Sequence, residues 1–205
     1  MSLWSVTTIS ASPIRTFPGP KWTTPLEQAR EVGVSSKLLT SDADVDSFGG
    51  DMSVFLANEQ AAEVEMGFLR HLAELVLAEE GYPQSTEVTL LLVNEEEMVG
   101  YNERFLQRTG PTDVLAFPVE ELLPGVVPDH DVHWPPIMLG DVIIAPAYVQ
   151  RQAVEFEVGF EDEMALMVTH GILHLLGYDH EIDEEAESME RRERQLLDKV
   201  GRTRR

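Results

Sequence analysis

Residues 170–180 read His-Gly-Ile-Leu-His-Leu-Leu-Gly-Tyr-Asp-His and place three imidazoles within one short stretch. In a helix, His170 and His174 lie one turn apart, about 40° around the axis, so both rings project from the same face. Gly177 stands where a helix can end in a left-handed residue, which would turn the chain back and bring His180 toward the other two rings. The pattern predicts a site at a helix end where three ring nitrogens share one cation.

Three histidine ligands without a fourth protein ligand are typical of a catalytic zinc ion that keeps one position for water, whereas structural zinc sites close that position. A lone histidine would more often pack at the edge of a core. Three histidines at offsets of 0, 4 and 10, with glycine at offset 7, favour metal binding instead. We therefore predict one Zn²⁺ ion held by His170, His174 and His180. Nickel, copper and iron also accept imidazole, so the metal identity stays an inference.

The histidine spacing resembles that of the metzincin zinc proteases, His-Glu-x-x-His-x-x-Gly-x-x-His, in which the Glu acts as general base. Here Gly171 occupies the position of that Glu. A glycine cannot take a proton from zinc-bound water, so protease chemistry loses its base while a metzincin-like metal geometry is kept. A metalloprotease is therefore a disfavoured alternative.

Composition limits the class of protein. The chain has 205 residues, of which 43% are hydrophobic, so it can bury one substantial core. It has no cysteine, which excludes disulfides, thiolate zinc ligands and cysteine nucleophiles. No apolar run approaches the length of a membrane span, and residues 1–10 lack the basic start and apolar core of a secretory signal. We expect a cytoplasmic protein without membrane contact, whose oligomeric state the sequence does not determine.

The net charge of −22 opposes nonspecific attraction to nucleic acid, so an RNA substrate would need a local basic patch. Arginines group in three places, at positions 104 and 108, within 191–194 and within 202–205. The ordinary interpretation of each group is a solvated surface.

The chain divides near Met52. Residues 1–51 contain scattered Pro, Ser, Thr, Gly and Asp without a sustained apolar period. We expect this segment to be disordered or a misassigned N-terminal extension, for which Met52 offers an alternative translation start. We expect one folded domain over residues 52–205.

The apolar pattern within this domain predicts four strands and about five helices. Short runs rich in Val, Leu and Ile read as strands at 53–58, 87–93, 113–117 and 141–145. Helical spacing with start and stop signals indicates helices at 59–80, 95–105, 146–157, 161–176 and from 183 to about 200. The expected fold is α+β, or mixed α/β, with a four-stranded mixed sheet flanked by the helices. Pro118 favours an edge position for the third strand.

Residues 120–136 form a proline-rich stretch without periodicity, which predicts a long surface loop. This loop carries His130 and His133. They could be metal ligands, but an isolated pair in a loop is more often exposed to solvent, and we assign them no role.

Three of these stretches together resemble motifs of the YbeY endoribonuclease family. Residues 170–180 match the family signature His-Gly-x-Leu-His-Leu-x-Gly-Tyr-Asp-His throughout. Residues 111–118, Pro-Thr-Asp-Val-Leu-Ala-Phe-Pro, resemble its second motif, and residues 140–141, Gly-Asp before an apolar strand, resemble its third. The resemblance covers roughly Met52 to Val200.

The resemblance implies a zinc-dependent, single-strand-specific endoribonuclease that acts in rRNA processing, notably 16S rRNA 3′ end maturation, and in ribosome quality control. Its zinc ligands carry over to His170, His174 and His180. The implied partners are single-stranded ribosomal RNA and the ribosome or its small-subunit proteins. Zinc would lower the pKa of its water and polarise a phosphoryl oxygen, so hydroxide could form without a strong protein base.

One departure from the family concerns RNA contact. Many members have an arginine, thought to contact RNA, shortly before the proline that opens the second motif. Alignment of the family's Leu-Asn pair on residues 101–102, and of its proline on Pro111, puts that arginine position at Leu106. Arg104 or Arg108 could supply the phosphate contact instead, since guanidinium pairs well with phosphate oxygens. The sequence does not choose between them.

The sequence also leaves open the role of Asp179 and the class of the protein. Asp179 could orient a histidine or the water, or it could cap a turn, because Asp commonly bonds nearby backbone amides. The protein could instead be a ribosome-assembly factor in which zinc only holds the fold. Its acidic surface would then dock on basic ribosomal proteins.

Overall fold

The computed structural model describes residues 53–131 and 133–205, so the prediction for residues 1–51 lies outside the described part. Within that part the chain forms a four-stranded sheet, five α-helices and one π-helical segment. The strands are β1 Ser53–Asn58, β2 Thr86–Leu92, β3 Val114–Pro118 and β4 Ile137–Ile144. The helices are α2 Met66–Glu79, α3 Glu95–Tyr101, η1 Asn102–Leu106, α4 Pro146–Glu155, α5 Phe160–Leu175 and α6 Asp183–Lys199. The predicted mixed α/β fold is confirmed.

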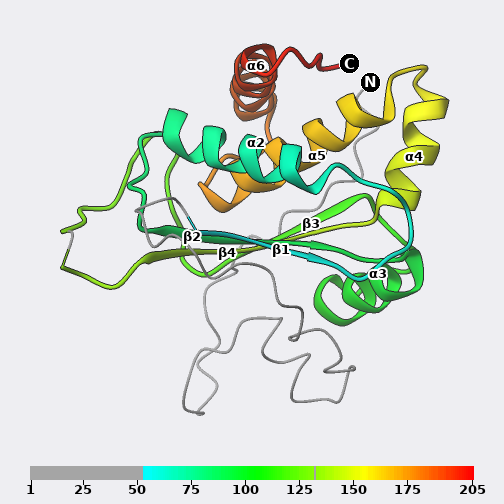
Figure 1. Ribbon diagram of the computed structural model, residues 1–205, viewed down its shortest axis with the longest axis horizontal. Coiled ribbons are helices and arrows are strands. Elements are labelled where there is room, and N and C mark those ends of the chain that lie inside the picture. Colours follow the sequence, from blue (N-terminus) through cyan, green and yellow to red (C-terminus); the bar gives the residue numbers. More distant parts are fainter. Residues whose placement is uncertain (1–52, 132) are drawn as a thin grey trace.

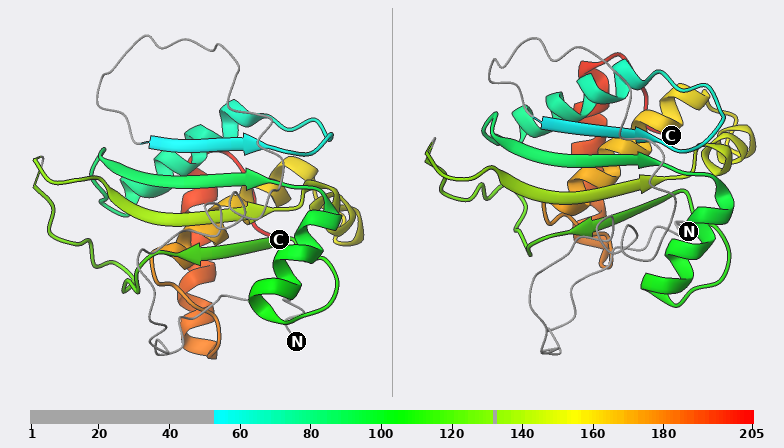
Figure 2. Two further views of the ribbon diagram at one scale, coloured as in Figure 1. Left: turned by 90° about the horizontal axis from the view of Figure 1, so that it is seen from below. Right: turned by 60° about the horizontal axis from the view of Figure 1, so that its bottom comes forward.

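The strands follow the order β1-β2-β4-β3 across the sheet. β1 pairs with β2 and β2 with β4 in parallel, while β3 pairs with β4 in antiparallel orientation. Figure 2 shows β3 at the edge of the sheet, pointing against the other strands. This order confirms the edge position that Pro118 predicted for β3. Proline fits there because an edge strand tolerates its missing N–H.

Two element boundaries differ from the predictions for local reasons. The helix expected from residue 59 begins at Met66, because Asn58 and Gln60 side chains fix an irregular turn through bonds such as Gln60 Nε2 to Asn58 Oδ1 at 2.8 Å. The strand expected from residue 141 begins at Ile137, which pairs with Thr86 of β2. Strand pairing thus extends β4 through the apolar residues Ile137, Met138 and Leu139 that precede Gly140.

The helix predicted over 95–105 is α-helical only to Tyr101 and continues as the π-helix η1. Asn102 begins this segment, and its Nδ2 donates to the carbonyl of Gly110 at 2.8 Å. Gln107 ends it with a left-handed φ of 56°. This irregular segment therefore positions Arg104 and Arg108, the two arginines predicted to contact phosphate.

The sheet separates two apolar clusters, because neighbouring strand residues point to opposite faces. Val142 of β4 packs with Leu72 of α2 and Leu173 of α5 in the larger cluster. Ile143 packs with Met98 of α3 in the smaller one. Figure 1 shows α2, α5 and α6 over one face of the sheet and α3 over the other. No helix in the described ranges is long and apolar enough to cross a membrane.

Candidate metal centre

The three histidines of the signature meet at the end of α5. His170 and His174 lie on its last turns and are both 3% exposed, and His180 follows in the connection to α6. The ring centroids of His170 and His174 are 4.4 Å apart, and those of His174 and His180 are 5.0 Å apart. One potential ligand atom from each residue lies within 4.8 Å of the others. The group could therefore hold a metal ion.

Gly177 makes the reversal that brings His180 back. Its φ is +90°, and its backbone N–H donates to the carbonyl of His174 at 3.0 Å. A Cβ atom at this position would lie 2.1 Å from the carbonyl oxygen of Leu122. Only glycine combines this left-handed conformation with so close a backbone neighbour, so the predicted role of Gly177 is confirmed.

Glu193 of α6 holds the ring of His170. The distance from His170 Nδ1 to Glu193 Oε1 is 2.6 Å, and Glu193 is 1% exposed. Burial alone would raise the pKa of Glu193, but hydrogen bonds from His170 and Arg204 outweigh it and lower this pKa. An ionised carboxylate can only accept, so Nδ1 of His170 carries a proton, and in the neutral ring Nε2 presents its lone pair.

A backbone carbonyl fixes His174 in the same way. Its Nδ1 lies 2.9 Å from the carbonyl oxygen of Tyr178, which accepts the proton of that nitrogen. Burial, and then the charges of His170 and His180, hold the pKa of His174 well below its ordinary value of 6.5. His174 is therefore neutral near pH 7, with the lone pair of Nε2 directed away from Tyr178.

The two Nε2 atoms of His170 and His174 lie 2.9 Å apart. With both Nδ1 atoms protonated and both rings neutral, two lone pairs face each other at that distance, an arrangement that a bound cation stabilises. Nε2 of His180 is buried without a hydrogen-bond partner in the described part of the chain. Burial lowers the pKa of His180 as well. This donor set fits a metal ion that prefers nitrogen ligands, as zinc does.

Of the two roles left open for Asp179, the structure shows the contact of a turn cap, and the carboxylate beside a histidine ring comes from another residue. Asp179 Oδ1 accepts the backbone N–H of His180 at 2.7 Å, as a turn cap does. The carboxylate that contacts a histidine ring is that of Glu193, which the sequence analysis missed. One signal in the sequence could have found it: Glu193 is an acidic residue inside the apolar stripe of α6. A carboxylate in such a position is buried and needs a partner.

Gly171 lies on the side of α5 that faces the sheet. A Cβ atom there would be 2.4 Å from Val142 Cγ1 and 3.2 Å from Val114 Cγ2. No larger side chain fits, so the position that carries the general base in metzincin proteases is closed in this fold. The motif strand β3, through Val114, thus helps to seat the helix that carries the ligands.

The two candidate phosphate contacts lie away from this cluster. Leu106, at the position of the family's arginine, packs with η1 against the smaller apolar cluster. The smaller apolar cluster lies under α3, and α3 covers the face of the sheet opposite α5 (Figure 1). Arg104 is exposed and lies 5.3 Å from the ring centroid of Phe105. Arg108 is also exposed and lines a pocket of about 130 Å³ together with Thr112.

The two loop histidines have separate surroundings. His130 Nε2 lies 2.7 Å from Ser85 Oγ, and His133 is exposed. Neither belongs to the metal-compatible group found in the described residues.

Known proteins resemble this chain over its folded part. The family model "Endoribonuclease YbeY" matches residues 55–201. The chain is 44% identical to Endoribonuclease YbeY of Acidothermus cellulolyticus over 66% of this chain and 83% of that protein. It is 40% identical to the Thermobifida fusca protein of that name over 71% and 92%, respectively. The solution structure of TM1509 from Thermotoga maritima shares 29% identity over 72% of this chain and 91% of that chain, with a TM-score of 0.49. From the family match and the two relatives, the chain belongs to the YbeY endoribonuclease family.

Proposed function

We propose that this protein is a zinc-dependent, single-strand-specific endoribonuclease that matures the 3′ end of 16S rRNA in the cytoplasm and acts in ribosome quality control. The observation that carries the proposal is the convergence of His170, His174 and His180, with two rings fixed through Nδ1 and two Nε2 lone pairs facing each other. Family membership supports the RNA substrate. Residues 52–205 are the proposed catalytic unit.

In this proposal the chain's own residues orient the ligands. When bound, zinc supplies an acidified water and a Lewis acid for a phosphoryl oxygen. Glu193 holds the Nδ1 proton of His170, and the carbonyl of Tyr178 holds that of His174, so in each neutral ring Nε2 is the nitrogen left to bind a metal ion. Asp179 fixes the backbone before His180. No protein base is needed at Gly171, where the fold admits none.

The proposed RNA contacts are Arg104 and Arg108. Phosphate binding needs local positive charge in a chain whose net charge is −22, and both guanidinium groups are exposed. Arg108 is the stronger candidate because the pocket that it lines also contains the exposed Thr109, whose hydroxyl can donate to a phosphate oxygen. An RNA strand that reached both the pocket and the histidines would pass around the edge strand β3.

Salt titration of RNA binding tests these contacts. Removal of a phosphate contact reduces the slope of log affinity against log salt by about 1. We expect this change for Arg108→Ala and a smaller one for Arg104→Ala. Equal slopes for the wild type and both variants would place the phosphate contacts elsewhere.

Cleavage of a single-stranded 16S rRNA fragment tests the enzyme. Wild type and His174→Ala are compared for cleavage, metal content by mass spectrometry and folding by circular dichroism. His71→Ala is the matched control, because His71 is an exposed histidine on α2. We expect His174→Ala to stay folded and to lose both zinc and cleavage, while His71→Ala keeps both. A base-paired fragment should resist cleavage.

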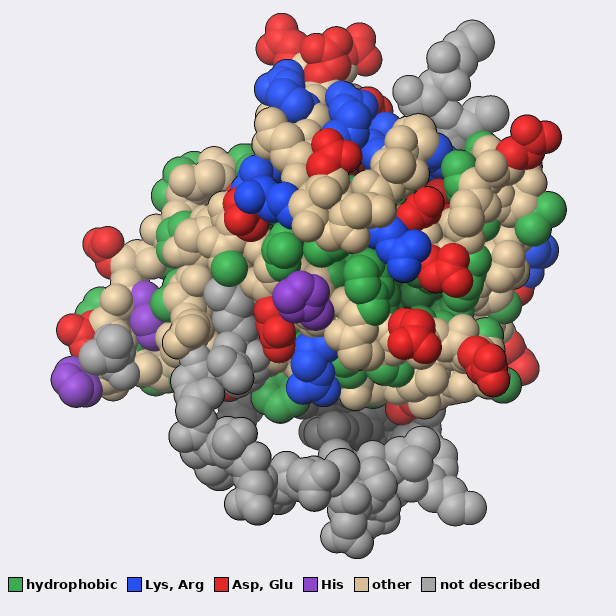
Figure 3. Space-filling view, turned by 45° about the horizontal axis from the view of Figure 1, so that its top comes forward, with side chains coloured by type: hydrophobic (Ala, Val, Ile, Leu, Met, Phe, Trp, Pro, Cys, Tyr) green, Lys and Arg blue, Asp and Glu red, His purple; other side chains and the backbone are tan. Residues whose placement is uncertain are grey.

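Acidity favours one second candidate, a ribosome-assembly factor with a structural zinc ion. A net charge of −22 suits docking on basic small-subunit proteins. Figure 3 shows acidic side chains on the face that α2 and α6 cover, interspersed there with Lys and Arg. If wild type bound stoichiometric zinc without cutting RNA, and His174→Ala lost stability together with ribosome binding, this second function would replace the first.

A further inference from the structure

The side chain of Arg204 is largely buried, in contrast to the solvated surface that the sequence predicted for the arginines of residues 202–205. Its side chain is 7% exposed, and its Nε donates to Glu193 Oε2 at 2.5 Å. Its Nη2 lies 3.2 Å from Glu190 Oε1. The prediction is wrong for Arg204 because the segment after α6 folds back onto the protein instead of extending into water.

Glu193 therefore has a different partner on each of its two oxygens. Oε1 accepts from His170 Nδ1 and Oε2 accepts from Arg204 Nε. A carboxylate held at both oxygens has little freedom to rotate, and charge-assisted bonds of this kind are the stronger class of hydrogen bond. These two contacts connect Arg204 through Glu193 to His170, and they fix the direction in which Nε2 of His170 points.

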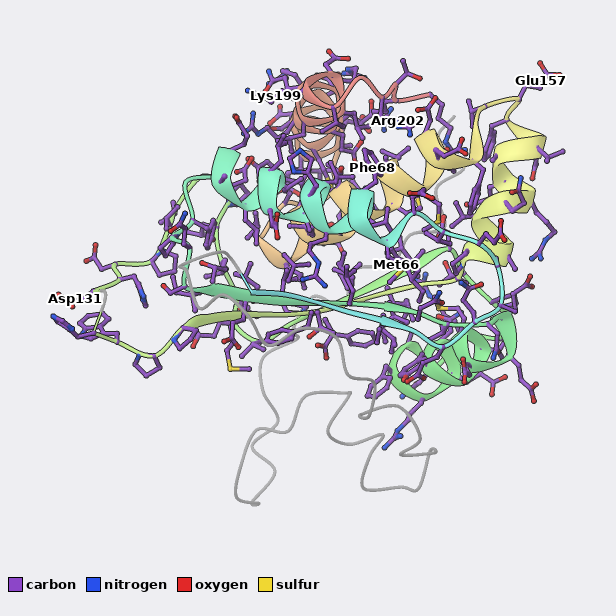
Figure 4. All side chains as sticks on the ribbon, in the orientation of Figure 1. Met66, Phe68, Asp131, Glu157, Lys199 and Arg202 are labelled. Atoms are coloured by element: carbon purple, nitrogen blue, oxygen red, sulfur yellow. The ribbon has the colours of Figure 1, made fainter. Side chains whose placement is uncertain are left out.

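The segment that carries Arg204 is anchored on both sides. Arg205 Nη2 lies 2.9 Å from Glu163 Oε1, a carboxylate of α5 that is 1% exposed. The guanidinium carbon of Arg202 lies 4.9 Å from the ring centroid of Phe68, and both residues are labelled in Figure 4. The backbone N–H of Arg202 also donates to the carbonyl of Leu197 at 3.0 Å. These contacts hold Arg204 over Glu193 without relying on the Arg204 side chain alone.

We propose that Arg204 is a positioning residue for the metal site. It locks the carboxylate of Glu193 in the orientation that aligns His170 for metal binding. The inference rests on the proposed metal site and adds a residue outside the family's motifs. Removal of Arg204 leaves Glu193 buried with one free oxygen, so its carboxylate can rotate and His170 loses its fixed orientation.

Metal affinity, measured without RNA, is the test. Zinc affinity comes from competition with a chelator, and Co²⁺ absorption reports the geometry of the ligands. Changes in the residues that orient metal ligands typically cost about 10–100-fold in affinity. We expect Arg204→Ala to lose about tenfold with an altered Co²⁺ spectrum, and Arg204→Lys to lose less. Arg191→Ala is the control, because Arg191 is an exposed arginine of α6.

A double-mutant cycle separates positioning from general stability. If Arg204 acts through Glu193, Arg204→Ala should change zinc affinity little in a Glu193→Gln background. Additive losses, or wild-type affinity and spectrum in folded Arg204→Ala, would overturn the inference. If Arg204→Ala does not fold, Arg204→Lys alone and with Glu193→Gln completes the cycle. A wild type that binds neither metal would refute the proposed site as well, whereas metal binding insensitive to Arg204 would refute this inference alone.

Discussion

Gly171 of α5 lies so close to Val142 of β4 that a Cβ atom on the glycine would be 2.4 Å from Val142 Cγ1. The metal-ligand helix therefore rests directly on the sheet at the residue that follows its first ligand. This contact sets the distance between α5 and β4, because packed interiors leave no room for an added methyl group. The helix that carries His170 and His174 is consequently held by the sheet, and His170 is held by Glu193 of α6 as well.

We expect Gly171→Ala to destabilise the protein by about 1–3 kcal/mol, the usual cost of forcing extra carbon into a packed core. The measurement is urea denaturation followed by circular dichroism. Gly100→Ala is the control, since a Cβ at that position of α3 meets nothing within 4 Å. Val142→Ala should recover part of the loss when combined with Gly171→Ala. Equal midpoints for Gly171→Ala and the wild type would show that α5 can move away from the sheet freely.

Substitution of Gly177 in the turn should lower zinc affinity more than it lowers the stability of the fold. An alanine there must adopt a φ of +90° and meet the carbonyl oxygen of Leu122 at 2.1 Å, so the chain has to leave this path. His180 would then no longer reach the other two rings. We expect Gly177→Ala to lower zinc affinity by at least about tenfold, as loss of ligand alignment does. Isothermal titration with zinc measures it, and wild-type affinity in the variant would contradict it.

Tyr178 supports the site through its backbone and the fold through its side chain. Its carbonyl holds His174, while its hydroxyl donates to Glu80 Oε2 at 3.1 Å. Burial and the charge of Glu80 raise the pKa of Tyr178 to about 12, so the hydroxyl stays protonated. Tyr178→Phe should therefore cost about 1–2 kcal/mol of stability and leave zinc affinity unchanged. Loss of zinc affinity in this variant would show that the ring, and not the carbonyl, positions His174.

Stability of the zinc-stripped protein should depend on pH through His174. Its folded-state pKa is well below the ordinary 6.5, so below pH 6.5 the unfolded chain binds a proton that the folded chain excludes. The free energy of unfolding should therefore fall as pH decreases below 6.5 and level off above it. The lowered pKa of His180 acts in the same direction. Urea denaturation at about pH 8 and about pH 5.5 measures the difference.

Replacement of His174 by alanine should reduce this slope, because the excluded proton disappears with the ring. A variant with the full slope would assign the pH dependence to other groups. With zinc bound, the free energy of unfolding should fall more steeply as pH decreases, since protonated imidazole cannot bind a cation.

The supporting residues of the site show where sequence reasoning stopped. The ligands follow a local pattern, because one helical turn and one glycine reversal place them regardless of the rest of the chain. Glu193 is 23 residues from His170, and their contact depends on how α6 crosses α5. The acidic residue in an apolar stripe signalled a buried pair but could not name its partner. Arg204 carried no such signal.

The sequence by itself determined the elements, the edge position of β3 and the three candidate ligands, because these follow from periodicity, proline chemistry and short spacings. Tertiary structure alone decided what lies around them. It packs Gly171 against Val142, which leaves no room for a side chain after His170. It also brings Glu193 into contact with His170 and buries the side chain of Arg204. It places Arg104 and Arg108 beside the smaller apolar cluster, which lies on the sheet face opposite the histidines. The physical reason is that buried charge and close packing are properties of pairs of elements, whose approach no single segment encodes.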